Sequence, residues 1–212
     1  MKNPFNTFIG FSGLMIQNID TISKEKILEF SKLIHNGALQ SFEMMQNLFD
    51  WVKSQQKGIV VRPVEIMLPE LLMSIIKLFS SEARKKNIKL SLKTNDKLNI
   101  LSDIDMLNTI LRNLVSNALK FTNKGGEIQI SFQKGDSEIQ FNIIDNGVGM
   151  TSEKQSELFD VHTNTSSSGT EYEKGTGLGL VLCKEFIDLL KGKIWVESEL
   201  GKGTCFSFII PQ

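Results

Sequence analysis

The sequence predicts an α+β fold, in which a two-layer sandwich of helices on one face of a mixed β-sheet follows an all-α helical hairpin. Apolar residues recur at helical spacing through residues 1–57, and β-rich, alternating segments begin after Gly58. Helical segments with an apolar face lie between the later strands. We therefore expect two domains, a hairpin over residues 1–57 and a sandwich over residues 58–212.

The first 57 residues are expected to form two helices joined by a short turn over residues 20–24. Apolar side chains advance by threes and fours in both helices, on stripes wide enough for burial on more than one side, as in a helix bundle. The stripes contain Phe5, Ile9, Ile16, Ile27, Phe30, Ile34, Met45 and Val52. Because one hairpin cannot close a four-helix core alone, we expect it to pair with a second copy.

Strand and helix patterns follow one another through the second domain. The expected strands cover residues 59–68, 88–94, 98–101, 127–133, 138–145, 193–198 and 204–210. The expected helices cover residues 69–86, 104–121 and 176–190, and a polar stretch covers residues 151–174. Asp103 is expected to cap the second of these helices, whose core stripe is Ile104, Leu107, Leu111, Leu114 and Ala118.

The overall charge and the cysteines exclude several classes of function. Lysine and arginine number 24 and so do aspartate and glutamate, so we expect no basic surface for nucleic acid or an acidic membrane. Cys183 and Cys205 lack the spacing of a zinc or redox motif and are expected to be buried thiols. No apolar run approaches the ~18 residues of a membrane span, so we expect a soluble chain without direct membrane contact.

Polar residues share one face of the expected helix over residues 104–121. Asn113, Asn117 and Lys120 follow at spacings of four and three, on a different face from the apolar stripe. Two amide oxygens and one ammonium would suit a phosphate-bound magnesium ion, because magnesium prefers oxygen ligands. A solvated helix face is the alternative.

A carboxylate ends the apolar strand over residues 138–145. Asp145 is followed by Asn146, Gly147, Val148 and Gly149, a run that would also fit an ordinary hairpin turn. A buried Asp145 could accept a hydrogen bond from an adenine amine. The glycines would then let the backbone lie against the purine ring.

A glycine-rich run opens the helix expected over residues 176–190. Its residues are Lys174, Gly175, Thr176, Gly177, Leu178 and Gly179. Backbone amides at such a helix start can bind an anion. The spacing differs from the Rossmann fingerprint, and the sequence contains no Walker lysine motif.

Together these segments resemble the N, G1, F, G2 and G3 boxes of histidine kinases, which share a superfamily with gyrase, Hsp90 and MutL. The shared order is an asparagine-bearing helix, an Asp-Asn-Gly-x-Gly turn, a polar stretch, a Gly-x-Gly-x-Gly helix start and a late Gly-Lys-Gly-Thr turn at residues 201–204. The resemblance extends from about residue 59 to the end of the chain. It implies an ATP-binding domain with ATP and Mg²⁺ as cofactors.

The resemblance also implies roles for individual residues. Asn117 would be the magnesium ligand with Asn113 in support, Lys120 would face the phosphates, and Asp145 would specify adenine. The implied contacts of the nucleotide and its metal ion are Asn113, Asn117, Lys120, Phe121, Asp145, Gly147, Gly149, Phe159, Lys174, Gly175, Thr176, Gly177, Leu178, Gly179 and Thr204.

The polar stretch over residues 151–174 would form a lid over the triphosphate. Phe159 occupies the F-box position within it, and a simple core anchor is a second interpretation that is compatible with the first. His162 lies in the same stretch and is expected to be solvated or to face the phosphates. The glycines at 175, 177 and 179 would shape the hinge of the lid.

Asn113 also separates subfamilies within the superfamily. Members that hydrolyse ATP place a glutamate four residues before the metal-binding asparagine, where its carboxylate can activate water. Asn113 occupies that position here, and an amide cannot accept a proton in that way. This favours phosphoryl transfer to another acceptor over hydrolysis.

The first residues indicate where the phosphate would be accepted. In the family, the first bundle helix carries a pattern like His-Glu/Asp-x-Arg/Lys-Thr/Asn-Pro-Leu/Phe, and residues 1–5 (MKNPF) resemble its latter part. The acceptor histidine is then expected two residues before Met1. His35 lies in an apolar row of the second helix, where we expect core or interface packing.

The resemblance therefore implies a protein-histidine kinase of a two-component system, with a truncated dimerisation hairpin over residues 1–57. It would transfer the ATP γ-phosphate to a histidine, from which the phosphate passes to a response-regulator receiver domain. We expect a homodimer through the hairpin in the full-length protein, while the oligomeric state of residues 1–212 stays open. We also expect a cytoplasmic location, which includes the cytoplasmic part of a membrane-anchored receptor, and no self-phosphorylation by residues 1–212. The alternatives are an ATPase of the same superfamily and a non-catalytic nucleotide-binding signalling scaffold.

Overall fold

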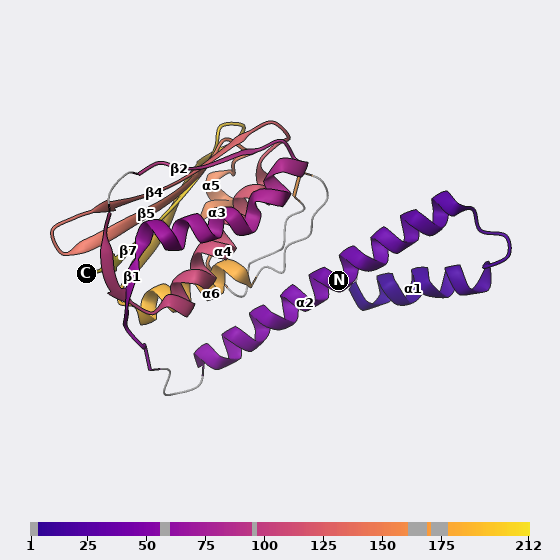
Figure 1. The fold of residues 1–212 in the computed structure, drawn as a ribbon, viewed down its shortest axis with the longest axis horizontal. Helices are drawn as coiled ribbons and strands as arrows, with labels where there is room; N and C mark the ends of the chain where they lie inside the picture. The colour runs from indigo at the N-terminus through magenta and orange to yellow at the C-terminus, as the bar shows by residue number, and fades with distance from the viewer. Residues whose placement is uncertain (1–3, 56–59, 95–96, 161–168, 171–177) are drawn as a thin grey trace.

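The computed structural model describes residues 4–55, 60–94, 97–160, 169–170 and 178–212 (Figure 1). Its helices are α1 (Pro4–Gln17), α2 (Lys24–Gln55), α3 (Leu68–Lys85), α4 (Ile104–Phe121), α5 (Ser152–Glu157) and α6 (Gly179–Leu189). Its strands are β1 (Val64–Met67), β2 (Lys89–Leu92), β3 (Asn99–Ser102), β4 (Glu127–Lys134), β5 (Glu138–Asp145), β6 (Lys193–Glu199) and β7 (Gly203–Pro211). The predicted α+β fold with a preceding helical hairpin is confirmed, whereas the domain boundary after residue 57 stays a prediction.

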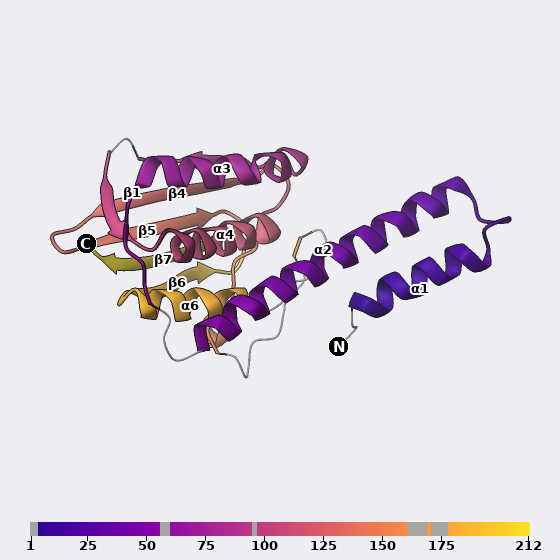
Figure 2. The same ribbon diagram turned by 60° about the horizontal axis from the view of Figure 1, so that its bottom comes forward.

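Five strands form a mixed sheet in the order β2–β4–β5–β7–β6. Strands β2 and β4 are parallel, and the other neighbours are antiparallel. Strands β1 and β3 form a separate antiparallel pair. Helices α3, α4 and α6 lie on one face of the larger sheet, so this part of the chain has the two predicted layers (Figure 2).

The core lies between the helical layer and the sheet. Phe141 of β5 and Phe208 of β7 are fully buried there, and their rings stack with centroids 4.6 Å apart. The opposite face of the sheet is more polar, and Asn142 accepts a hydrogen bond from the Ser207 hydroxyl over 2.9 Å. Cys183 is buried as predicted. The prediction for Cys205 was wrong, because it is half-buried on the polar face, beside Ser207.

Helix α4 lies between α3 and α6. One oxygen of Asp103 accepts the amides of Asp105 and Met106 over 3.1 Å each, which confirms the predicted cap. The other oxygen accepts the Arg62 amide over 2.9 Å. The buried stripe contains Leu107, Leu111, Leu114 and Ala118. The prediction for Ile104 was wrong: it is 41% exposed, because the first helical residue lies at the edge of the core.

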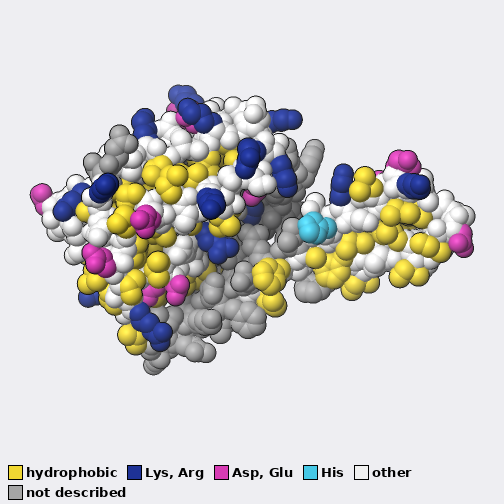
Figure 3. Space-filling model, in the orientation of Figure 1, with side chains coloured by type: hydrophobic (Ala, Val, Ile, Leu, Met, Phe, Trp, Pro, Cys, Tyr) yellow, Lys and Arg dark blue, Asp and Glu magenta, His cyan; other side chains and the backbone are white. Residues whose placement is uncertain are grey.

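The hairpin leaves many apolar side chains uncovered in the single chain. Phe11 and Phe30 contact each other across it, with ring centroids 5.0 Å apart. However, Ile9 is 63% exposed, Ile16 73% and Phe42 55%. Figure 3 shows hydrophobic side chains gathered along the hairpin. Where its side chains are described, one hairpin therefore leaves part of its apolar stripes exposed, as the sequence indicated.

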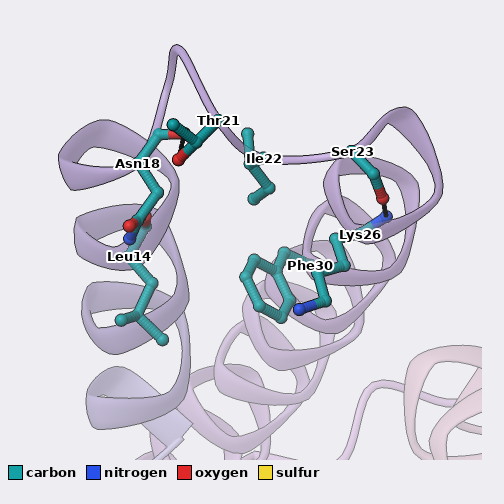
Figure 4. Close-up of a pocket in the computed structure, with 7 residues that line it drawn as sticks. All are labelled: Leu14, Asn18, Thr21, Ile22, Ser23, Lys26 and Phe30. Atoms are coloured by element: carbon teal, nitrogen blue, oxygen red, sulfur yellow. Dashed lines mark hydrogen bonds between the residues drawn. The ribbon is translucent and has the colours of Figure 1, made fainter.

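An open pocket of about 390 Å³ lies between the end of α1 and the start of α2 (Figure 4). Its lining residues are Leu14, Asn18, Thr21, Ile22, Ser23, Lys26 and Phe30. The Ser23 hydroxyl accepts the Lys26 amide over 3.3 Å and so caps α2. None of the predicted nucleotide contacts lines this pocket, so it belongs to the hairpin and not to the predicted site.

Helix α5 was not predicted, because a loop was expected over residues 151–174. The first turn of α5 contains Glu153, at a position that the helix dipole favours for an acid. Helix α6 begins at Gly179, later than the expected start at Thr176. Among the described residues, none of the helices is both long and apolar enough to cross a membrane.

Candidate functional site

Asn113, Asn117 and Lys120 are half-buried on α4, away from its fully buried stripe, so the predicted polar face is confirmed. Asn113 donates its amide to the Thr109 carbonyl over 2.9 Å. A Cβ added to Gly179 would lie 2.6 Å from Oδ1 of Asn113. The start of α6 therefore meets the polar face of α4, and a glycine permits this approach.

Asp145 is the last residue of β5, and only 5% of it is exposed. Its Oδ1 accepts the Gly147 amide over 2.9 Å, and the backbone of Thr204 on β7 donates a further hydrogen bond. Burial outweighs these two bonds and raises the pKa of Asp145 to about 6. The structure thus brings together the two residues that were predicted near adenine, while their contact with adenine stays a prediction.

Gly147 and Gly149 allow two close backbone approaches. A Cβ on Gly147 would overlap the Phe121 carbonyl at the end of α4, and Val148 donates its amide to the same carbonyl over 3.1 Å. Gly149 has a φ of +64°, and a Cβ there would overlap the Glu199 carbonyl at the end of β6. Both glycines are therefore required by packing within the chain. Their predicted contact with a purine ring remains a prediction.

Sequence reasoning missed Ser198, which joins the two loops around Asp145. Its hydroxyl accepts the Met150 amide and lies 2.9 Å from the Gly203 carbonyl and from the Thr204 hydroxyl. Because a carbonyl can only accept, the Ser198 proton points to Gly203, and Ser198 accepts the Thr204 proton. A polar residue at a strand end carries no spacing signal that could have identified this role.

Three further predicted residues are described. Phe121 ends α4 and Leu178 immediately precedes α6, and both are half-buried. Phe159 is half-buried and packs against the hydrophobic core, which confirms its interpretation as a core anchor. A role for any of them at the nucleotide stays a prediction.

Parts of the predicted lid and hinge lie outside the described residues. Lys174, Gly175, Thr176 and Gly177 lie outside the described residues, and so does His162. His35 is exposed on α2, so its expected packing in a core was wrong for the single chain. Its packing at an interface between two chains stays a prediction.

Amide oxygens are the metal ligands that α4 offers. In the parts of the chain that the structure describes, no three His, Cys, Asp or Glu side chains gather in a way that could hold a metal ion. Asn113 and Asn117 would supply oxygen ligands, and Mg²⁺ completes its shell with phosphates and water. The residues present therefore fit a nucleotide-bound magnesium ion.

A comparison with protein families matches residues 102–212 to the family described as histidine kinase-, DNA gyrase B-, and HSP90-like ATPase. The match begins just before the cap of α4. It includes every residue that was predicted to contact the nucleotide or its metal ion.

Curated relatives of the chain are sensor kinases. The adaptive-response sensory kinase SasA of Crocosphaera subtropica is 30% identical over 193 residues, which cover 88% of this chain and 50% of SasA. The sensor protein EvgS of Escherichia coli is 30% identical over 218 residues, which cover 100% of this chain and 18% of EvgS. The chain thus spans half or less of the length of these relatives.

Solved histidine kinases have a similar fold. The catalytic domain of histidine kinase ThkA is 28% identical, with a TM-score of 0.62, and the match covers 71% of this chain and 97% of that domain. Full-length ShkA in complex with AMPPNP is 25% identical, with a TM-score of 0.73, over 98% of this chain and 43% of ShkA. The second likeness includes the hairpin as well as the sandwich.

Proposed function

Because the chain belongs to the family of histidine kinase-, DNA gyrase B-, and HSP90-like ATPases, we propose that it binds ATP as the kinase core of a two-component sensor histidine kinase. The observation that carries this proposal is the buried carboxylate of Asp145, held at a strand end beside Thr204. Gly147 and Phe121 join this strand end to the polar face of α4. Curated relatives that are 30% identical are sensor kinases, which supports the kinase class.

Adenine recognition would depend on Asp145. With a pKa of about 6 the carboxyl is charged at neutral pH and can accept an N–H of the adenine amine. The Thr204 hydroxyl directs its proton to Ser198, so its lone pairs can accept a further hydrogen bond. ShkA was solved with the ATP analogue AMPPNP, which supports ATP as the ligand.

Magnesium would bind Asn117, with Asn113 in support, and would neutralise phosphate charge when bound. We expect Asn117→Ala to remove the magnesium-dependent part of the ATP affinity, while adenosine affinity changes less than about twofold. Calorimetric titrations with and without Mg²⁺ measure both. Ser116→Ala, on the same turn of α4, is the matched control. An equal loss of ATP and adenosine affinity in Asn117→Ala would contradict the metal role.

The proposed reaction transfers the γ-phosphoryl group to a histidine of the first bundle helix. An imidazole nitrogen forms a bond to the γ-phosphorus as the bond to the bridging oxygen breaks, which leaves ADP. Catalysis would come from positioning and charge neutralisation. Lys120 would contribute its charge on the phosphate side.

A chain extended by His-Glu before Met1 completes the family pattern that residues 1–5 resemble. We expect this extended chain to take up acid-labile label from γ-labelled ATP. A Gln-Glu extension is the matched control and is expected to stay unlabelled. Label in both chains would point to His35 or His162 as the acceptor. Label in neither, while both bind ATP, would favour a non-catalytic scaffold.

ATP hydrolysis is the second candidate reaction. A hydrolytic member of the superfamily needs a carboxylate that takes a proton from water. The amide of Asn113 cannot do this, and it already donates a hydrogen bond to the Thr109 carbonyl. This observation favours transfer over hydrolysis.

The proposed onward step is transfer to an aspartate of a response-regulator receiver domain in the cytoplasm. The likeness to curated sensor kinases, which are 30% identical to this chain, supports this partner. The test is loss of label from the phosphorylated His-Glu chain when a receiver domain is added. Loss of label to a receiver whose aspartate is replaced by alanine would contradict the proposed acceptor.

The hairpin is proposed to form a homodimer, because its apolar stripes are exposed in the single chain. We expect Ile9→Asp to shift the molar mass in light scattering from dimer to monomer, since it places a charge on a stripe. Gln17→Asp, on the same helix, is expected to leave the mass unchanged. A monomeric unsubstituted chain would contradict this proposal.

A further inference from the structure

Lys86 is a buried lysine that no sequence pattern singled out. It follows α3 as its C-terminal cap and is only 4% exposed, whereas Arg84 and Lys85 before it are exposed. Lysine side chains are almost never buried to this extent unless they are paired. The hydrogen-bond partners of Lys86 must therefore account for its burial.

The Lys86 ammonium lies at the C-terminal end of α4. It donates to the Leu119 carbonyl over 2.9 Å and to the Thr170 hydroxyl over 3.0 Å. The Lys86 carbonyl accepts the Gly125 amide over 3.0 Å, in the turn that follows α4. A cation at this position also meets the negative end of the helix dipole.

Each of the last four backbone carbonyls of α4 accepts a hydrogen bond. An α-helix leaves its last four carbonyls without partners inside the helix. Here the partners are the Thr122 amide for Ala118, the Lys86 ammonium for Leu119, the Thr170 amide for Lys120 and the Val148 amide for Phe121. Lys120 and Phe121 are predicted nucleotide contacts, and these bonds fix the turn that carries them.

Thr170 complements Lys86 at this turn. Its hydroxyl lies 3.2 Å from the Lys120 carbonyl and 3.1 Å from the Thr122 carbonyl. Both carbonyls can only accept, so the hydroxyl proton points to one of them, and a lone pair is left for the Lys86 ammonium. Lysine and threonine thus form one connected network with the end of α4.

We propose that Lys86 is a positioning residue for the phosphates of the nucleotide, which acts through the last turn of α4 and Thr170. This inference rests on the proposed ATP-binding function. Asp145 accepts its hydrogen bonds from Gly147 and Thr204 and none from Lys86 or Thr170, so its carboxyl does not belong to the lysine and threonine network. Loss of Lys86 should therefore weaken binding of the triphosphate more than binding of the nucleoside.

Lys86→Met keeps the apolar stem of the side chain and removes its charge. We expect the Mg-ATP affinity to fall roughly tenfold, as for the loss of one hydrogen bond from a charged group. The adenosine affinity is expected to change less than about twofold. Thr170→Val keeps the shape of threonine without its hydroxyl and is expected to act in the same direction. Because both residues belong to one network, the double variant is expected to lose less than the two single losses combined.

Calorimetry on the full chain measures these affinities, with two controls. Lys85→Met removes an exposed lysine from the same helix end and is expected to change neither affinity. Ile139→Val removes a buried methyl group at the far end of β5 and controls for a general loss of stability.

The measured affinities distinguish failure of the inference for Lys86 from failure of the proposed function. An unchanged ATP affinity, or an equal loss for ATP and adenosine as in Ile139→Val, would overturn the inference for Lys86. If Lys86→Met does not fold, the ratio of ATP to adenosine affinity in Thr170→Val decides in the same way. Failure of the unsubstituted chain to bind either ligand would instead overturn the proposed function.

Discussion

Replacement of Asp145 by asparagine is expected to stabilise the folded chain at neutral pH and to remove adenine recognition. The pKa of the buried carboxyl is about 6, against an ordinary value of 3.8. At about 1.4 kcal/mol per pKa unit, its charge costs the folded state about 3 kcal/mol above pH 6. An asparagine carries no charge and can still accept the Gly147 amide. Its amide hydrogens, however, would face the adenine amine, and we expect the affinity to fall roughly 10- to 150-fold.

The gain in stability is expected to depend on pH. Below about pH 4 the carboxyl is protonated in the folded and the unfolded state, so variant and parent are similarly stable. As the pH rises towards 6, the unfolded chain loses this proton first, and the parent loses stability that the variant keeps. Urea unfolding at pH 5 and pH 8 measures the difference. A gain that is the same at both pH values would exclude the buried charge as its cause, and an unchanged ATP affinity would exclude the adenine role.

Gly149→Ala is expected to destabilise the chain far more than Gly201→Ala. Both glycines have positive φ, +64° and +81°, so an alanine at either position costs about 1–2 kcal/mol of backbone strain. A Cβ on Gly201 meets nothing within 4 Å, whereas one on Gly149 overlaps the Glu199 carbonyl and lies 3.1 Å from the Leu200 Cα. Backbone cannot rotate aside, so the loop must shift, and we expect a total of about 3 kcal/mol or more for Gly149→Ala.

Thermal and urea unfolding of the two alanine variants provide the comparison. Because the loop of Gly149 also carries Gly147 and adjoins Asp145, we expect Gly149→Ala to weaken ATP binding, and Gly201→Ala to leave it nearly intact. Equal destabilisation by the two substitutions would mean that positive φ alone requires these glycines. The contact with the end of β6 would then have no energetic role.

One-sided burial made most of the fold predictable. The stripe of α4 and the alternation in β4 and β5 follow directly from which side chains face the core. Helix α5 was missed because six residues are too few to establish a helical period, and none of them is buried. Ile104 was assigned to the core because its spacing fits the stripe. It is exposed, however, because the first residue of the helix lies at the edge of the core.

The candidate site was predictable only in part. The order of polar and glycine segments resembles that of histidine kinases, and this resemblance brought Asp145, Thr204 and the face of α4 into one hypothesis. Lys86 and Ser198 could not be found in this way, because their partners are distant in sequence: Leu119 is 33 residues from Lys86 and Met150 is 48 from Ser198. The need for Gly149 likewise depends on a carbonyl of β6, which only the assembled fold places beside it.

The end of α4 also constrains the order in which the domain can fold. Its carbonyl partners come from three segments, and Thr170 is 50 residues away from Lys120. The early turns of a helix need only local contacts, but this last turn must stay paired with water until β5 and the segment before α6 have docked. Phe121 and Lys120 are therefore expected to reach their final positions late. A nucleotide that contacts them would bind only chains that have finished folding, and its binding would stabilise the last contacts to form.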